Sequence, residues 1–127
     1  MTIFESDLRQ FTGTENWYRH GFVRNVLYTD GAKYVAEEAQ AYWLLDLIAT
    51  SQLEKVGGNK TVAAEGFQTW VLKVDGGKAV LTCDDGNGNV VFTREIEFTD
   101  FPAESVTLWC CDGGPGGCKV IMLPSEY

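Results

Sequence analysis

The chain has 127 residues, of which 45% are hydrophobic and 13% aromatic, and its formal net charge at pH 7 is −8. A chain of this length and composition can bury a core without disulfides or metal, so we expect a single domain spanning residues 1–127. The negative charge disfavours direct binding to nucleic acid and to anionic membranes, because Lys and Arg supply most of the affinity for such surfaces.

The beginning of the chain predicts its compartment. The segment MTIFESDLRQF carries acidic side chains and no apolar run of signal-peptide length, and no other segment is apolar for long enough to span a bilayer. We therefore expect a cytoplasmic protein whose four cysteines are reduced thiols. Its acidic surface could attract a basic protein partner; the alternative is that the charge only provides solubility.

The first half of the chain predicts one dominant helix. A short helix is expected over residues 4–11 and a strand over residues 22–28, and residues 34–53 then predict one long amphipathic helix. Its expected inner face consists of Val35, Ala39, Tyr42, Asp46 and Ala49. Because a carboxylate is costly in such an apolar segment, we expect Asp46 to contact Arg19, His20 or Arg24, or to lie at the edge of a cleft.

The second half of the chain changes to a period of two residues. Strands are expected over residues 67–75, 78–84, 89–99, 106–111 and 118–123. In the third of these, Val90, Phe92, Ile96 and Phe98 are expected to face inward. The short links rich in Gly, Asp and Asn imply antiparallel neighbours. The expected fold class is α+β, with an N-terminal short helix and strand and one long amphipathic helix packed on an antiparallel meander of about five strands.

The candidates for catalysis and ligand binding lie near His20, the only histidine of the chain. A zinc-protease helix of the HExxH type is excluded, and no Gly-x-Ser-x-Gly nucleophile motif is present. His20 could act as a general base oriented by Asp46, with Arg19 as a further charged group. The aromatic candidates for binding a ligand are Trp17, Tyr18 and Tyr42. The alternative is that His20 only ties its segment to the long helix.

The cysteines allow a metal site without indicating one. Cys83, Cys110 and Cys118 could bind zinc together with His20, but they lack the CxxC spacing that identifies such sites. A bridge between Cys111 and Cys118 under oxidising conditions is an alternative, and buried apolar thiols are the default. We expect no cofactor.

A group of carboxylates is the expected interaction surface, consisting of Glu95, Glu97, Asp100 and Glu104. Glu95 and Glu97 are two residues apart and are expected on the outward face of one strand. The alternative is an ordinary solvated strand face. An exposed aromatic patch could also be a homodimer interface.

Three motifs of the sequence are distinctive: FTGTENWYRH at residues 11–20, LYTDG at residues 27–31 and AYWLLD at residues 41–46. Together they resemble a family of small uncharacterised bacterial proteins that also occur on phages and plasmids, and Gln52, Gln68 and Trp70 extend the likeness. The resemblance assigns no activity. It implies a bacterial cytosol and an accessory role in a mobile element.

The sequence favours a non-enzymatic cytoplasmic protein that binds a protein partner, in an accessory or inhibitory role, through acidic and aromatic surface. One alternative is a small enzyme or ligand-binding protein with a pocket around His20 and Asp46. A second alternative is a metal-binding protein based on its cysteines.

Overall fold

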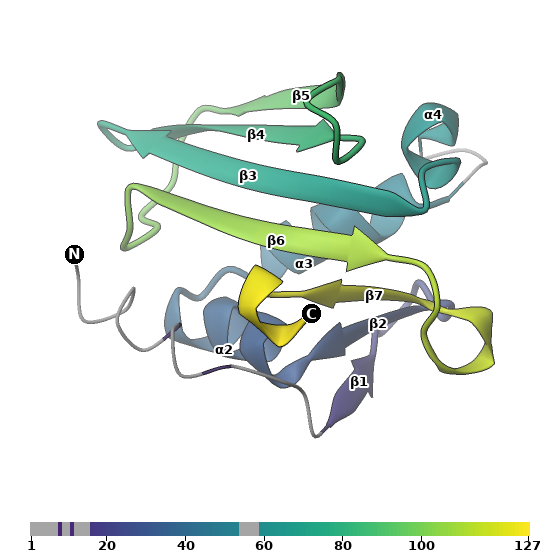
Figure 1. Cartoon of the computed structure of the whole chain (residues 1–127). Coiled ribbons are helices and arrows are strands. Elements are labelled where there is room, and N and C mark those ends of the chain that lie inside the picture. Colours follow the sequence, from purple (N-terminus) through teal and green to yellow (C-terminus); the bar gives the residue numbers. More distant parts are fainter. Residues whose placement is uncertain (1–7, 9–10, 12–15, 54–58) are drawn as a thin grey trace.

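The computed structural model describes residues 8, 11, 16–53 and 59–127, and in this part of the chain helices cover one side of a single sheet (Figure 1). The strands are β1 (Trp17–Arg19), β2 (Val26–Thr29), β3 (Phe67–Asp75), β4 (Lys78–Asp84), β5 (Val90–Ile96), β6 (Ser105–Cys111) and β7 (Lys119–Met122). The helices are α2 (Asp30–Glu38), α3 (Tyr42–Ser51) and α4 (Lys60–Ala63), and the short 3-10 turns are η1 (Pro115–Gly117) and η2 (Pro124–Glu126). None of the described helices is long and apolar enough to cross a membrane.

The sheet confirms the α+β class and corrects its expected topology. Its seven strands run in the order β1-β2-β7-β6-β3-β4-β5, and every neighbouring pair is antiparallel except β2 and β7. The prediction of a five-stranded meander is therefore wrong. Strands β3, β4 and β5 do follow one another as a meander, but β6 returns to the far side of β3, and β7 joins the N-terminal strands to the sheet.

The link from β5 to β6 explains why the meander stops. Residues 97–104 do not form a tight turn but run back past the β3–β4 hairpin. The Thr99 backbone N–H donates to the Gly77 carbonyl, and the Val74 N–H donates to the Glu104 carbonyl, each over 2.7 Å. Phe101, which belongs to this link, is buried. The link thereby covers one end of the sheet and delivers β6 to the free edge of β3.

The expected long helix is two helices. Helix α2 ends at Glu38 and α3 begins at Tyr42, and Gln40 between them has a positive φ of 51°. The break changes which side chains face the sheet, because Leu44, Leu45 and Ile48 are buried whereas Tyr42 is exposed. An unbroken helix would keep Tyr42 in phase with Val35. The interruption turns the most apolar side of α3 toward the sheet instead.

The N-terminal elements also differ from expectation. The short helix expected over residues 4–11 lies mostly outside the described residues, although Leu8 is helical. The first strand is shorter than expected, at Val26–Thr29, because residues 21–25 form bends and a turn. Strand β1, at Trp17–Arg19, was not expected and pairs with β2.

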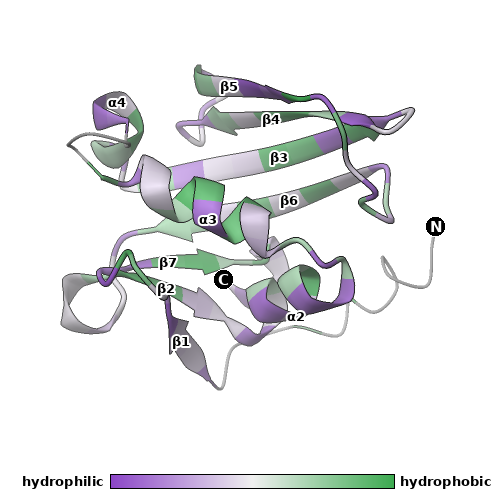
Figure 2. Cartoon of the chain, turned by 180° about the vertical axis from the view of Figure 1, so that it is seen from behind, coloured by the Kyte–Doolittle hydropathy of each residue, from purple (hydrophilic) through white to green (hydrophobic). Residues whose placement is uncertain are grey.

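The two faces of the sheet are unequal. Helices α2 and α3 lie over one face (Figure 2). The largest buried side chains belong to the core cluster that these helices share with the sheet. These include Trp70, Leu72, Leu81, Leu108 and Ile121. The opposite face carries the C-terminal turn η2, which lies in front of β6 and β7 (Figure 1). Beyond that turn, no described helix covers the rest of the second face.

A carboxylate from the end of the chain fixes the start of α2. The side chain of Glu126 accepts hydrogen bonds from the Thr29 hydroxyl (2.6 Å), the Gly31 N–H (3.0 Å) and the Leu123 N–H (2.9 Å). Thr29 is also the N-cap of α2, because its hydroxyl oxygen accepts from the Ala32 N–H. A negative charge at this position is favoured by the unpaired N–H groups and the dipole of the helix.

Candidate functional site

His20 and Asp46 are paired, so His20 is the one among the three expected basic residues that contacts this carboxylate, whose side chain is 47% exposed. The His20 Nε2 and Asp46 Oδ1 atoms are 2.7 Å apart. The His20 Nδ1 atom accepts from the backbone N–H groups of Phe22 and Val23, so Nε2 carries the proton and donates it to Asp46. Phe22 packs edge-on against the imidazole, at 4.5 Å between ring centroids. Both nitrogens of the buried ring are therefore engaged within the protein, an arrangement that anchors the segment after β1 to α3.

The other candidates from the N-terminal half do not converge on this pair. Trp17 and Arg19 lie on the opposite face of β1 from Tyr18, because side chains alternate along a strand. Arg19 donates to the Arg24 carbonyl. The Tyr18 hydroxyl donates to Asp30 over 2.9 Å, and this hydrogen bond raises the pKa of Tyr18. Tyr42 donates to Glu37.

The cysteines are separated by the sheet. Cys83 and Cys110 belong to the helix-covered core, whereas Cys118 packs with Leu27 and Val120 on the other face. Among the described residues, no group of three or more His, Cys, Asp or Glu side chains is arranged to hold a metal ion. Cys111 and Cys118 are free thiols in this structure.

Burial raises the pKa of three of these thiols, those of Cys83, Cys110 and Cys111. The pKa of Cys83 rises to about 12 and that of Cys111 to about 11. Because the thiolate is the reactive form and all four thiols are buried away from the reagent, we expect none of them to react rapidly with Ellman's reagent at pH 8 in the native protein. In denaturant all four should react within the mixing time. Rapid reaction of one thiol before denaturation would contradict the burial described for that residue.

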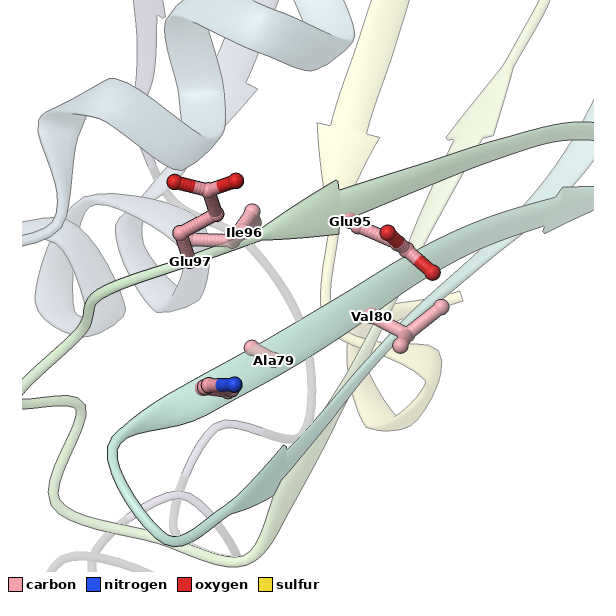
Figure 3. A pocket seen from close by; sticks show the side chains of 6 residues that line it. Ala79, Val80, Glu95, Ile96 and Glu97 are labelled. Atoms are coloured by element: carbon pink, nitrogen blue, oxygen red, sulfur yellow. The ribbon is translucent and has the colours of Figure 1, made fainter.

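The expected acidic surface is divided, because Glu95 belongs to the edge strand opposite β1 whereas Glu104 lies beside β3, where its carbonyl accepts from the Val74 N–H. Glu95, Glu97, Asp100 and Glu104 are all exposed. Strand β5 is the edge strand and ends at Ile96, so Glu97 lies beyond it in a bend. Figure 3 shows the carboxylates of Glu95 and Glu97 directed to opposite sides of the ribbon, which corrects their expected placement on one strand face.

A pocket of about 570 Å³ lies where these carboxylates meet β4. Its lining residues are Lys78, Ala79, Val80, Glu95, Ile96 and Glu97. Val80 is paired with Glu95 across the two strands, and Figure 3 shows the two side chains on the same side of the sheet. The residues that line the pocket are thus of mixed apolar, acidic and basic character, at the edge of the sheet.

Two apolar side chains that were expected inside are exposed, one at the start of β5 and one beyond its end. Phe98 is 84% exposed and Val90 is 59% exposed, whereas Phe92 and Ile96 are partly buried as the alternation predicts. The reason is that β5 ends before Phe98, and a register shift opposite Cys83 and Asp84 disturbs the pairing near Val90. Sequence periodicity could not locate either irregularity.

Gln52, Gln68 and Trp70, which the sequence singled out only through the family resemblance, form a buried hydrogen-bond network. Gln52 Nε2 donates to Gln68 Oε1 over 2.8 Å, and Gln68 Nε2 donates to Gln52 Oε1 over 2.7 Å. The Trp70 indole N–H also donates to Gln68 Oε1. These contacts join the end of α3 to β3 within the core. They indicate a structural role for the three residues.

A model of a family of unknown function (DUF6876) matches residues 2–127. The chain belongs to this family. This membership agrees with the resemblance of the three sequence motifs to an uncharacterised family. Because the function of the family is unknown, membership assigns no activity to the chain. No curated protein and no solved structure matches the chain.

Proposed function

We propose that this family member is a non-enzymatic interaction protein that binds an extended, basic segment of a partner protein along the outer edge of β5. The observation that carries the proposal is the open edge of this seven-residue strand, which pairs only with β4 among the described residues. An extended segment can add to such an edge through backbone hydrogen bonds. The exposed Val90 and Phe98 would then supply apolar contacts beside the new strand.

Charge supports a basic partner. Residues 90–104 carry four exposed carboxylates, those of Glu95, Glu97, Asp100 and Glu104, and one basic side chain, that of Arg94. The whole chain has a net charge of −8. Such a surface accelerates association with a positively charged partner and disfavours acidic ones. It also disfavours association with a second copy of the chain, because both copies would carry the same net negative charge.

The biological setting forms part of the proposal. We infer a cytoplasmic protein with an accessory or inhibitory role in a mobile element of bacteria or their phages, and this inference rests on the motif likeness described from the sequence. An acidic protein in that role would occupy the basic surface of its partner.

A displayed library of random nine-residue peptides tests the proposal directly. Peptides selected on the wild-type protein should be rich in Lys, Arg and β-branched residues, which suit an added strand beside carboxylates. The double variant Glu95→Lys with Glu97→Lys should bind the selected peptides at least about tenfold more weakly, because two attractive charges become repulsive. The loss should shrink as salt is added.

The matched control is the double variant Glu37→Lys with Glu38→Lys, which makes the same change in net charge on the exposed end of α2. It should retain most of the affinity. Equal losses in the two double variants would mean that net charge alone governs binding, and the β5 edge would lose its assigned role. Selection of acidic peptides would contradict the proposal outright.

A further inference from the structure

Backbone hydrogen bonds determine which groups of β5 are left for a partner. The Val74 N–H donates to the Glu104 carbonyl, on the β6 side of β3. Because backbone groups alternate in direction along a strand, those of the neighbouring Lys73 point to β4, where Lys73 is paired with Val80. The backbone groups of Val80 therefore point to β3. Those of the next residue, Leu81, then point to β5.

The same alternation places two residues of β5 at the open edge. Leu81 is paired with Arg94, so the backbone groups of Arg94 point to β4. Those of Thr93 and Glu95 then point away from the sheet, where no described strand pairs with them. An added antiparallel strand would bond to these two residues. Arg94 would lie between them in a non-hydrogen-bonded pair, the type in which opposing side chains approach most closely.

The side chains of β5 alternate between the two faces of the sheet. Phe92 packs against Trp70, at 5.4 Å between ring centroids, and Ile96 also packs on the core. Arg94 shares their face, because the pairing with β4 is regular from Phe92 to Ile96. Glu95 has the opposite face. The two charges of β5 are therefore of opposite sign and lie on opposite faces.

Both charges are available to a partner. Arg94 and Glu95 are exposed, and within the described part of the chain neither forms an ion pair, Glu97 included as a possible partner of Arg94. Phe92 and Ile96, on either side of Arg94, are only partly buried. A side chain placed opposite Arg94 would therefore meet a guanidinium group between two apolar neighbours. A side chain placed opposite Glu95 would meet a carboxylate on the other face.

We infer that the partner segment pairs antiparallel with β5 and carries its charges in a fixed order. A basic residue lies opposite Glu95 and an acidic residue opposite Arg94, with apolar residues opposite Phe92 and Ile96. Like charges directly opposite each other destabilise a strand pair, and a shift of one residue would place every side chain on the wrong face. The inference rests on the proposed docking at β5 and adds the order of residues that this edge selects.

Two synthetic nine-residue peptides of identical composition test this order. The central five residues of the first read Val-Lys-Glu-Thr-Val from the amino end, which places its lysine opposite Glu95 and its glutamate opposite Arg94 in an antiparallel strand. The second exchanges the central lysine and glutamate, and both have Lys-Thr before the centre and Thr-Lys after it. In fluorescence anisotropy at low salt, the first should bind the full chain about tenfold more tightly, because the exchange replaces two attractive cross-strand pairs with two repulsive ones.

A charge-exchanged protein provides the matched control. The double variant Arg94→Glu with Glu95→Arg leaves the net charge at −8 and alters two exposed side chains. It should reverse the preference between the two peptides. Amide exchange should show that the first peptide protects the N–H groups of Thr93 and Glu95 more than that of Arg94, which already points to β4.

The possible outcomes separate this inference from the docking itself. Equal binding of the two peptides to the wild-type protein, with β5 protected, would overturn the order of charges while leaving docking at β5 in place. Failure of both peptides, although library-selected peptides protect β5, would do the same. If no basic peptide protects β5, the docking and the order both fail. A folded charge-exchanged variant that keeps the wild-type preference would also contradict the order, and the wild-type comparison is decisive without any variant.

Discussion

Replacing Glu126 with alanine is expected to lower the free energy of unfolding by about 3 kcal/mol, because a buried carboxylate that accepts three hydrogen bonds is removed and its donors lose their partner. Two of those donors lie at the start of α2 and the third is the Leu123 N–H just before η2. The variant therefore removes the contact that joins α2 to the C-terminal turn. Urea denaturation followed by circular dichroism measures the loss. Glu104→Ala, at an exposed carboxylate, is the control and should change stability by less than about 0.5 kcal/mol.

Gly31 provides a second, geometric check on the same contact. A Cβ atom at Gly31 would lie 2.3 Å from Glu126 Oε1 and 2.7 Å from Leu123 Cδ1, so Gly31→Ala should also destabilise the fold. Because Glu126→Ala removes one of the two clashing groups, the double variant should lose less than the sum of the single losses. Strictly additive losses would show that Gly31 and Glu126 are not coupled as described.

Gln68→Leu is expected to have an effect of similar size, about 3 kcal/mol, because it removes one half of a fully buried amide pair. The Gln52 amide would lose its reciprocal partner, and the Trp70 indole N–H would lose its acceptor. The Val62 and Glu65 carbonyls would lose a donor as well. Thermal and urea unfolding of the variant measure the cost.

The double variant Gln52→Leu with Gln68→Leu distinguishes the pair from two independent polar residues. Removing both partners leaves fewer unsatisfied groups than removing one, so its loss of stability should fall clearly below the sum of the two single losses. If the losses add, the two amides do not depend on each other, and the network does not connect α3 to β3 in the way described.

Local chemistry predicted the parts of the fold that depend on a few neighbouring residues. Gly76 and Gly77 have positive φ in the β3–β4 turn, which Asp75-Gly76-Gly77 indicated. The contact of Asp46 with one of three basic residues was also predictable, because a carboxylate within an apolar helix requires a partner. Alternation likewise located the strands of the second half, with their ends less well defined.

Long-range pairing was outside the reach of the sequence. Nothing local indicates that Val26 lies beside Lys119 in a parallel pair, or that Glu126 closes the start of α2. The break at Gln40 was missed because no Gly or Pro marks it. The exposed Gln40 has a positive φ there, and the Ala41 N–H donates to the Ala36 carbonyl, a local pattern that ends a helix. The exposed Phe98 was missed because only the end of β5 shows that the alternation has stopped.

Amide hydrogen exchange on the wild-type protein, with and without a basic peptide selected by the displayed library, tests the central claim most directly. Addition of a strand at β5 predicts that protection rises within residues 90–96 of β5, while the amides of β1 at the other edge keep their rates. Protection confined to other elements, or unchanged exchange at β5 with the peptide bound, would contradict the claim that this edge is the docking surface.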